Sequence, residues 1–133
     1  MTITGTRWSF PVDDEESRRK AFDALVDDAI DEIPSPFREH LDTVAIVTED
    51  DPPPQHVPPG QTLFGLFQGV PRTTFGVDSV PIANKISIYR HPHEWAFPDP
   101  EARRIAVENT VFHEVAHHFG ISDARLRELQ HRR

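Results

Sequence analysis

The chain has 133 residues, 13 of them proline, and a formal net charge of −8. That length fits one domain over residues 1–133, and the lack of cysteine excludes disulfides, thiol nucleophiles and cysteine-held zinc. The negative charge argues against a nucleic-acid partner, and the lack of a long apolar segment predicts a cytoplasmic protein without membrane contact, most simply a monomer.

The N-terminal part of the chain predicts an acidic amphipathic helix. Residues 13–51 hold 14 acidic and 4 basic side chains, which we interpret as a solvated face rather than a binding patch. Asp13 is the expected N-cap, with Glu16 completing a capping box. The helix should end before Pro34, because proline interrupts helices. Its apolar residues recur at helical spacing: Phe22, Leu25, Val26, Ala29 and Ile33.

Three segments rich in β-branched or aromatic residues predict strands: Thr43–Glu49, Thr62–Gly69 and Lys85–Arg90. The proline-rich segment Asp50–Gly60 between the first two is expected to be a stiff loop. Gly65 lies inside the second strand, which indicates either a bulge or a place where another backbone approaches closely. The pattern alone leaves both alternatives open.

The C-terminal part predicts one long helix. Asp99 and Pro100 form a typical helix start, so the helix should run from Pro100 to Phe119. Gly120 should end it in the left-handed conformation, and Ser122 can cap a last short helix. The expected apolar arc consists of Ile105, Phe112, Ala116 and Phe119, extended by Val111 and Val115.

The segment "VFHEVAHHFGISD" in this helix predicts a metal site. At 100° per residue, His113 and His117 lie within about 40° of each other, so both imidazoles can reach one ion. Glu114 is turned by about 100° from His113 and leans over the ion without binding it. This is the H-E-x-x-H pattern of zinc peptidases, in which the glutamate is the general base. His118 points elsewhere.

Catalytic zinc needs a third protein ligand and an open fourth position. A break at Gly120 turns the chain back, and Asp123 is then the nearest carboxylate that can reach the ion. The set matches H-E-x-x-H-x-x-G-x-x-D, the extended metzincin-type motif with aspartate in place of the third histidine. Tyr89 is interpreted as a packing residue, and His91 and His93 in "RHPHEW" as loop residues rather than ligands.

These residues resemble the small bacterial zincin-like, or minimal, zinc metallopeptidases, first described as a domain of unknown function. The resemblance covers nearly the whole chain, including "DTVAIVTED", "LFGLFQGVP" and "ISIYRHP". It implies an α+β fold in which a small mixed sheet packs against an N-terminal helix and a C-terminal active-site helix. It also implies Zn²⁺ held by His113, His117 and Asp123, with Glu114 as general base.

Two features depart from larger metzincins: the only methionine is Met1, and ten residues follow Asp123. We therefore expect neither a Met-turn nor a lower subdomain. The leading hypothesis is a zinc metallopeptidase that acts on a peptide or protein. A non-catalytic zinc-binding scaffold, or a zinc hydrolase of a non-peptide amide or ester, remains as an alternative. Retention of Glu114 favours the enzymes, since binding alone needs no base.

Zincins bind a peptide as an added strand along a sheet edge, through main-chain hydrogen bonds. In the family pattern, the strand that leads into the active-site helix is internal and the one before it forms the edge. The expected substrate platform is therefore the segment Leu63, Phe64, Gly65, Leu66 and Phe67.

Overall fold

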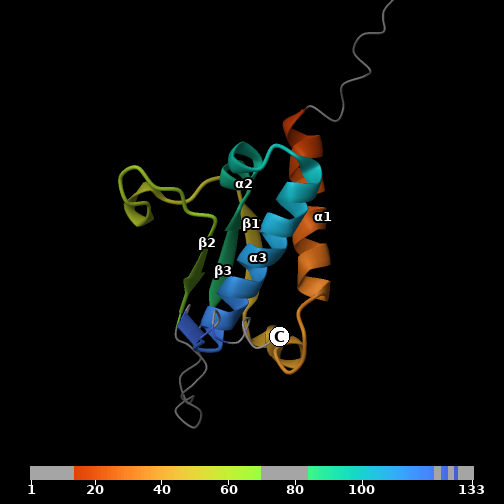
Figure 1. Cartoon of the computed structure of the whole chain (residues 1–133), viewed down its shortest axis with the longest axis vertical. Helices are drawn as coiled ribbons and strands as arrows, with labels where there is room; N and C mark the ends of the chain where they lie inside the picture. Colours follow the sequence, from red (N-terminus) through yellow and green to blue (C-terminus); the bar gives the residue numbers. More distant parts are fainter. Residues whose placement is uncertain (1–13, 70–83, 122–123, 126–127, 129–133) are drawn as a thin grey trace, which may run out of the picture.

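The structure, a computed structural model, describes residues 14–69, 84–121, 124, 125 and 128 (Figure 1). The predicted N-terminal arm, the loop 71–81, Asp123 and most of the predicted last helix lie outside these residues. The described part is an α+β fold, which confirms the predicted fold class. Its helices and strands are α1 (Glu15–Asp31), β1 (Ala45–Glu49), β2 (Gly65–Gln68), β3 (Lys85–Tyr89), α2 (Arg90–Ala96) and α3 (Pro100–His118), with short 3-10 helices at Arg38–Thr43 and Pro54–His56.

The three strands form one mixed sheet in the order β1-β3-β2. β1 runs parallel to β3, with Ile46 opposite Ile86, and β2 runs antiparallel to it, with Gly65 opposite Ile88. The strand before α2 and α3 is therefore central, and β2 forms an edge in the described part of the chain. This arrangement agrees with the predicted order of an internal last strand and an outer second strand.

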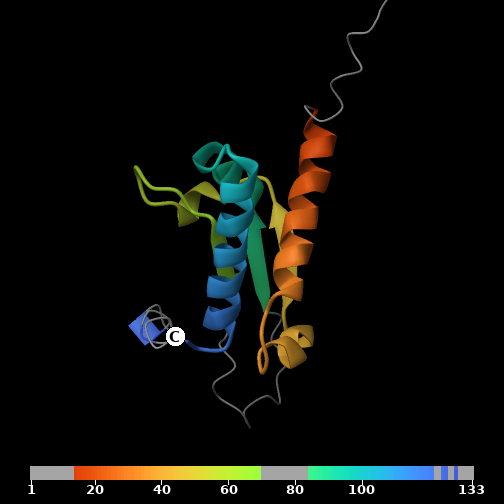
Figure 2. The same ribbon diagram turned by 45° about the vertical axis from the view of Figure 1, so that its right-hand side comes forward.

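Both long helices cover the same side of the sheet (Figure 2). The side chains of Ile86 and Ile88 point toward them from β3, because alternate strand residues share a face. The buried core cluster consists of Phe22, Val26, Ala29 and Ile33 of the N-terminal segment, Ile86 and Ile88, and Val107, Val111 and Val115 of α3. The predicted apolar stripe of the first helix is thus confirmed, with Leu25 only partly buried.

The predicted apolar arc of α3 is confirmed except at one position. Val111, Val115 and Ala116 are fully buried, and Phe112 and Phe119 pack against the core. Ile105, by contrast, is 46% exposed, and the buried Val107 takes its place in the stripe. The stripe of small β-branched residues lets α3 lie close to both α1 and the sheet.

The ends of α3 are as predicted. The carboxylate of Asp99 accepts a hydrogen bond from the backbone N–H of Ala102, and Gly120 has φ +80°. The N–H of Gly120 donates to the His117 carbonyl and that of Ile121 to the Ala116 carbonyl, which together make a Schellman motif. The chain therefore turns sharply just after His117.

Two local predictions are wrong. The N-cap of α1 is Asp14, which accepts from the N–H of Ser17, rather than Asp13. The segment "RHPHEW" is the short helix α2 and not a loop. Pro92 stands in the first turn of α2, where a backbone N–H has no helical partner, so the proline does not disrupt it.

Candidate metal centre and catalytic cleft

α3 and the start of β2 enclose a cleft of about 300 Å³. Its walls are formed by Thr62, Leu63, Phe64 and Gly65 on one side and by Asn109, Thr110, His113, Glu114 and His117 on the other. The three residues of the H-E-x-x-H pattern are therefore brought together in one cavity. Asp123, the expected third ligand, lies outside the described residues.

The ring of His113 is held in the form that suits a metal ligand. Its Nδ1 lies 2.9 Å from the backbone carbonyl oxygen of Asn109, one helical turn earlier. A carbonyl can only accept, so Nδ1 carries the hydrogen and Nε2 keeps its lone pair. Histidines that bind metals are commonly oriented by such a hydrogen bond from the other ring nitrogen. The chemistry of this donor fits a zinc ion.

Glu114 lies beside the histidines at the cleft wall. Its side chain is 14% exposed, and one carboxylate oxygen lies 3.7 Å from Nδ1 of His117. Gly65 faces it from the strand, since a Cβ built on Gly65 would lie 3.1 Å from Glu114 Cγ. The carboxylate is thus partly withdrawn from bulk water yet borders the space between the histidines and the sheet edge.

The free edge of β2 borders the same cleft. The N–H of Tyr89 donates to the Phe64 carbonyl, and opposed residues of antiparallel strands alternate between bonded and non-bonded pairs. Phe64, Leu66 and Gln68 therefore turn their backbone groups toward β3. Gly65 and Phe67 turn theirs outward, away from β3, where no described strand pairs with them.

The structure contradicts one of the two alternatives for Gly65, the bulge, and shows which way its missing side chain would point. Gly65 pairs in regular register with Ile88, so it makes no bulge. Its missing side chain faces α3, where an added Cβ would meet Thr110 Cγ2 at 2.8 Å. The glycine thus permits the close approach of the edge strand to the helix that carries the histidines.

His93 is a functional neighbour that the sequence interpretation missed. It is fully buried, its Nδ1 donates to the Tyr89 carbonyl at 2.7 Å, and its Nε2 lies 2.9 Å from Thr110 Oγ1. Burial lowers its pKa, so the ring is neutral near pH 7. His93 does not line the cleft and instead supports Thr110, which does. The four-residue spacing of Tyr89 and His93 could have indicated the hydrogen bond between them, had the segment been recognised as helical.

His118 points away from the cleft, as predicted. It is fully buried, with Nε2 2.8 Å from Thr43 Oγ1 and Nδ1 3.2 Å from Asn84 Nδ2. Tyr89 is also buried, and burial raises the pKa of its hydroxyl, which agrees with the predicted packing role.

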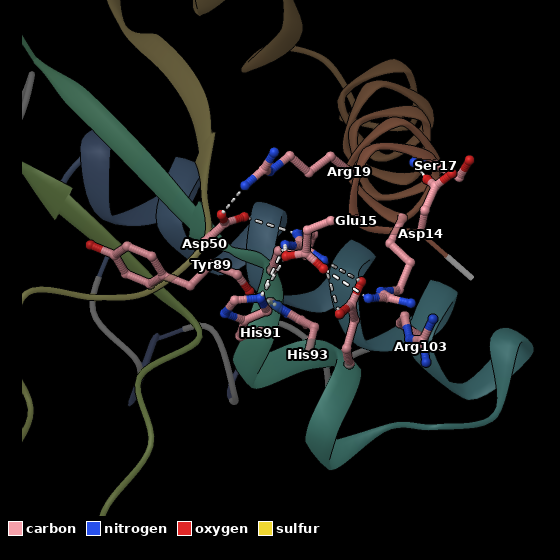
Figure 3. Close-up of polar contacts among 12 residues, drawn as sticks. Asp14, Glu15, Ser17, Arg19, Asp50, Tyr89, His91, His93 and Arg103 are labelled. Carbon is pink, nitrogen blue, oxygen red and sulfur yellow. Dashed lines mark hydrogen bonds and ion pairs between the residues drawn. The ribbon is translucent and has the colours of Figure 1, made fainter. Parts of the chain in front are cut away.

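A second group of possible ligands lies at the opposite end of α1 from Pro34. Among the described residues, Glu15, Asp50 and His91 offer donor atoms within 4.8 Å of one another (Figure 3). Arg90, whose side chain is 2% exposed, already pairs with both carboxylates and with Glu94. The guanidinium supplies the positive charge that a cation would bring, so we interpret the group as an ion-pair network.

This network, which we call the Arg90 cluster (Glu15, Asp50, Asp51, Arg90, His91 and Glu94), joins α1, the end of β1 and α2. Hydrogen bonds from Arg90, and further ones from Arg18 and Arg19, lower the pKa of Glu15 and of Asp50 to about 2. Burial alone would lower the pKa of His91, but hydrogen bonds to Asp51 and Glu15 raise it above its usual range.

The cluster predicts an acid-sensitive stability. We expect Arg90→Met to lower the free energy of unfolding at pH 7 by about 3 kcal/mol, because it removes the buried charge that pairs with three carboxylates, and the more exposed Arg18 and Arg19 compensate only Glu15 and Asp50. The depressed pKa values of Glu15 and Asp50 stabilise the fold above their ordinary values of 4.5 and 3.8, and that contribution is lost as the pH falls toward about 2. The difference in the free energy of unfolding between wild type and variant should therefore decrease as the pH falls from about 4 to about 2. Urea unfolding monitored by circular dichroism measures it.

Arg104→Met is the matched control. Arg104 pairs with Glu101 and Glu108 on the surface and its side chain is 42% exposed, so its loss should lower the stability far less than the loss of Arg90 does. An Arg90→Met variant as stable as Arg104→Met at pH 7 would contradict the structural role of the cluster.

No helix in the described part of the chain is long and apolar enough to cross a membrane.

Comparison with known families gives one match. A family model described as a zincin-like metallopeptidase matches residues 41–133, a range that holds the whole sheet, the cleft and Asp123. No curated protein matches the chain.

Proposed function

Because the chain belongs to the zincin-like metallopeptidase family, we propose that it is a zinc-dependent peptidase that hydrolyses peptide bonds in the cleft between α3 and β2. One observation supports this above the others. Two histidines and a glutamate in H-E-x-x-H spacing share a cavity with a strand edge that no other described strand pairs with. The site thus offers metal donors, a base and a platform for an extended chain together.

The proposed zinc ligands are His113, His117 and Asp123. The hydrogen bond to the Asn109 carbonyl prepares Nε2 of His113 as a donor. The left-handed turn at Gly120 redirects the chain after His117, which supports Asp123 as the third ligand. Three protein ligands leave one position for water, as catalytic zinc requires.

Zinc bound there would polarise the scissile carbonyl and make a water molecule acidic enough to attack at neutral pH. Glu114 takes the proton of the attacking water as its oxygen bonds to the carbonyl carbon. The carbon–nitrogen bond then breaks, and Glu114 delivers that proton to the leaving amine. The products are a carboxylic acid and an amine, and the base returns to its ionised form.

The substrate would extend β2 as an additional strand. Gly65 and Phe67 direct their N–H and carbonyl groups to the free edge, and the same alternation extends to Leu63. A peptide paired there would pass beside Glu114, because Gly65 and Glu114 line the same cleft. Recognition then depends mainly on main-chain hydrogen bonds, which any peptide can make.

A proline substitution tests this platform. Leu63→Pro removes a backbone donor that faces the edge, without removing a bond to β3, and should reduce kcat/KM by about tenfold through the loss of one hydrogen bond. The measurement is hydrolysis of a fluorogenic peptide, with zinc content and the melting temperature determined in parallel.

Leu63→Ala is the matched control, since it removes the same side chain and keeps the N–H. It should retain most of the activity that Leu63→Pro loses. Equal activity in the two variants would rule out main-chain recognition at this position.

The central experiment combines metal analysis with an unbiased activity screen. Protein purified without added metal should contain close to one zinc per chain, and incubation with a complex peptide mixture should give new peptide ends by mass spectrometry. Cleavage should disappear with a chelator and return with Zn²⁺. Zinc content without any cleavage would instead favour a non-peptide substrate or a non-catalytic role.

A further inference from the structure

At Gly65 the edge strand lies too close to the active-site helix to leave room for a side chain. A Cβ at this position would lie 2.8 Å from Thr110 Cγ2, 3.1 Å from Glu114 Cγ and 3.2 Å from the Ser87 carbonyl oxygen. Contacts below 3.0 Å do not occur between real atoms of this kind, so any side chain at position 65 forces a neighbour to move.

Two of the three neighbours cannot move easily. Ser87 is buried in the central strand, and the contacting atom belongs to its backbone. The rotamer of Thr110 is fixed because its hydroxyl lies between two acceptors that share its one hydrogen, the Ala106 carbonyl oxygen at 3.0 Å and Nε2 of the buried His93 at 2.9 Å. Turning its methyl group away would break both contacts.

Because Thr110 and Ser87 hold their places, a residue with a Cβ at position 65 has to shift away from Thr110, and Glu114 is the neighbour that can make room for that shift. The contacting atom is Cγ, in the middle of a side chain with several rotatable bonds, and the carboxylate beyond it borders the cleft. We infer that Gly65 is a positioning residue for Glu114: the bare Cα leaves the space in which the base is held, and the His93–Thr110 pair forms the fixed wall opposite. The role of Glu114 as a base rests on the proposed function. The packing of residue 65 against the Glu114 side chain does not depend on it.

Gly65→Ala is the direct test. The added methyl should displace the Glu114 side chain, so kcat should fall by at least tenfold while KM changes by less than about threefold, because misplacement of a catalytic group by about 1 Å is costly. Zinc affinity, measured by chelator competition, should stay within about twofold, since none of the three atoms nearest to a Cβ at position 65 belongs to His113 or His117. A crystal structure of the variant should show the Glu114 Cγ moved away from residue 65.

A second substitution provides a rescue. Gly65→Ala/Thr110→Ser removes the methyl group that lies closest to the new Cβ but keeps the hydroxyl next to His93. In the double variant the edge strand can shift toward residue 110, where the methyl group is missing. Part of the decrease in kcat and part of the decrease in melting temperature should therefore be reversed. Thr110→Ser alone should be close to wild type in stability.

Gly60→Ala is the matched glycine control. Gly60 has φ +77° and no atom within 4 Å of its virtual Cβ. Alanine there introduces backbone strain and lowers stability without approaching the helix, so kcat should not change.

The outcomes separate the two hypotheses. Normal kcat in Gly65→Ala, a parallel loss of zinc affinity, or an unmoved Glu114 in the crystal structure would overturn the positioning role. Absence of hydrolysis in the wild type would contradict the proposed function, and the crystal structure together with the melting temperatures of the single and double variants would still decide the positioning role.

Discussion

Glu114→Gln should retain zinc and lose nearly all hydrolysis. Glutamine has almost the same shape, so the contact with Gly65 and the packing at the cleft wall persist. It cannot accept a proton from water at neutral pH, however, and general base catalysis contributes roughly 10²–10⁴-fold. We expect kcat to fall by that factor, with the zinc content by mass spectrometry and the melting temperature close to wild type.

Glu108→Gln is the matched control for this substitution. Glu108 lies on the same helix, pairs with Arg104 at 2.8 Å and is not part of the cleft. The same chemical change there should leave kcat unaltered. If Glu114→Gln instead loses its metal, Glu114 is a ligand and the assignment of a base is wrong. If it keeps full activity, another group takes the proton.

The elements that were predicted well are those defined by local chemistry. Asp99, Pro100 and Gly120 affect the backbone only of residues close to them in sequence. Both ends of α3 could therefore be predicted from the sequence. The spacing of His113 and His117 is also local, because a helix fixes which residues share a face. The cleft, which both histidines line, agrees with their predicted common face.

The features that were missed depend on neighbours that are distant in sequence. From the sequence, Gly65 indicates either a bulge or a close approach of another backbone. Its actual neighbour, Thr110, is 45 positions later in the sequence and could not be predicted. The Arg90 cluster joins residues of α1, β1 and α2 with no common spacing. Pro92 obscured α2 because a proline interrupts a helix everywhere except in its first turn, and the turn is recognised only once the strand before it is known to end at Tyr89.

Asp123→Ala tests the remaining ligand, which the family motif proposes and which lies outside the described residues. Loss of one of three protein ligands should weaken zinc binding by more than the roughly 10–100-fold that loss of an outer hydrogen-bond partner of a ligand costs. The fold should persist, because the core of α1, β3 and α3 is formed by residues 22–115. Zinc dissociation constants from chelator competition and circular dichroism spectra measure the two effects separately.

Asp123→Asn and Glu128→Ala complete this test. Asparagine keeps an oxygen in nearly the same place but loses the negative charge, so its zinc affinity should fall between those of wild type and Asp123→Ala. Glu128 is another carboxylate of the C-terminal segment and pairs with Arg125, so its removal should leave zinc affinity unchanged. If Asp123→Ala binds zinc as wild type does while Glu128→Ala does not, the third ligand lies five residues beyond the position that the extended motif assigns.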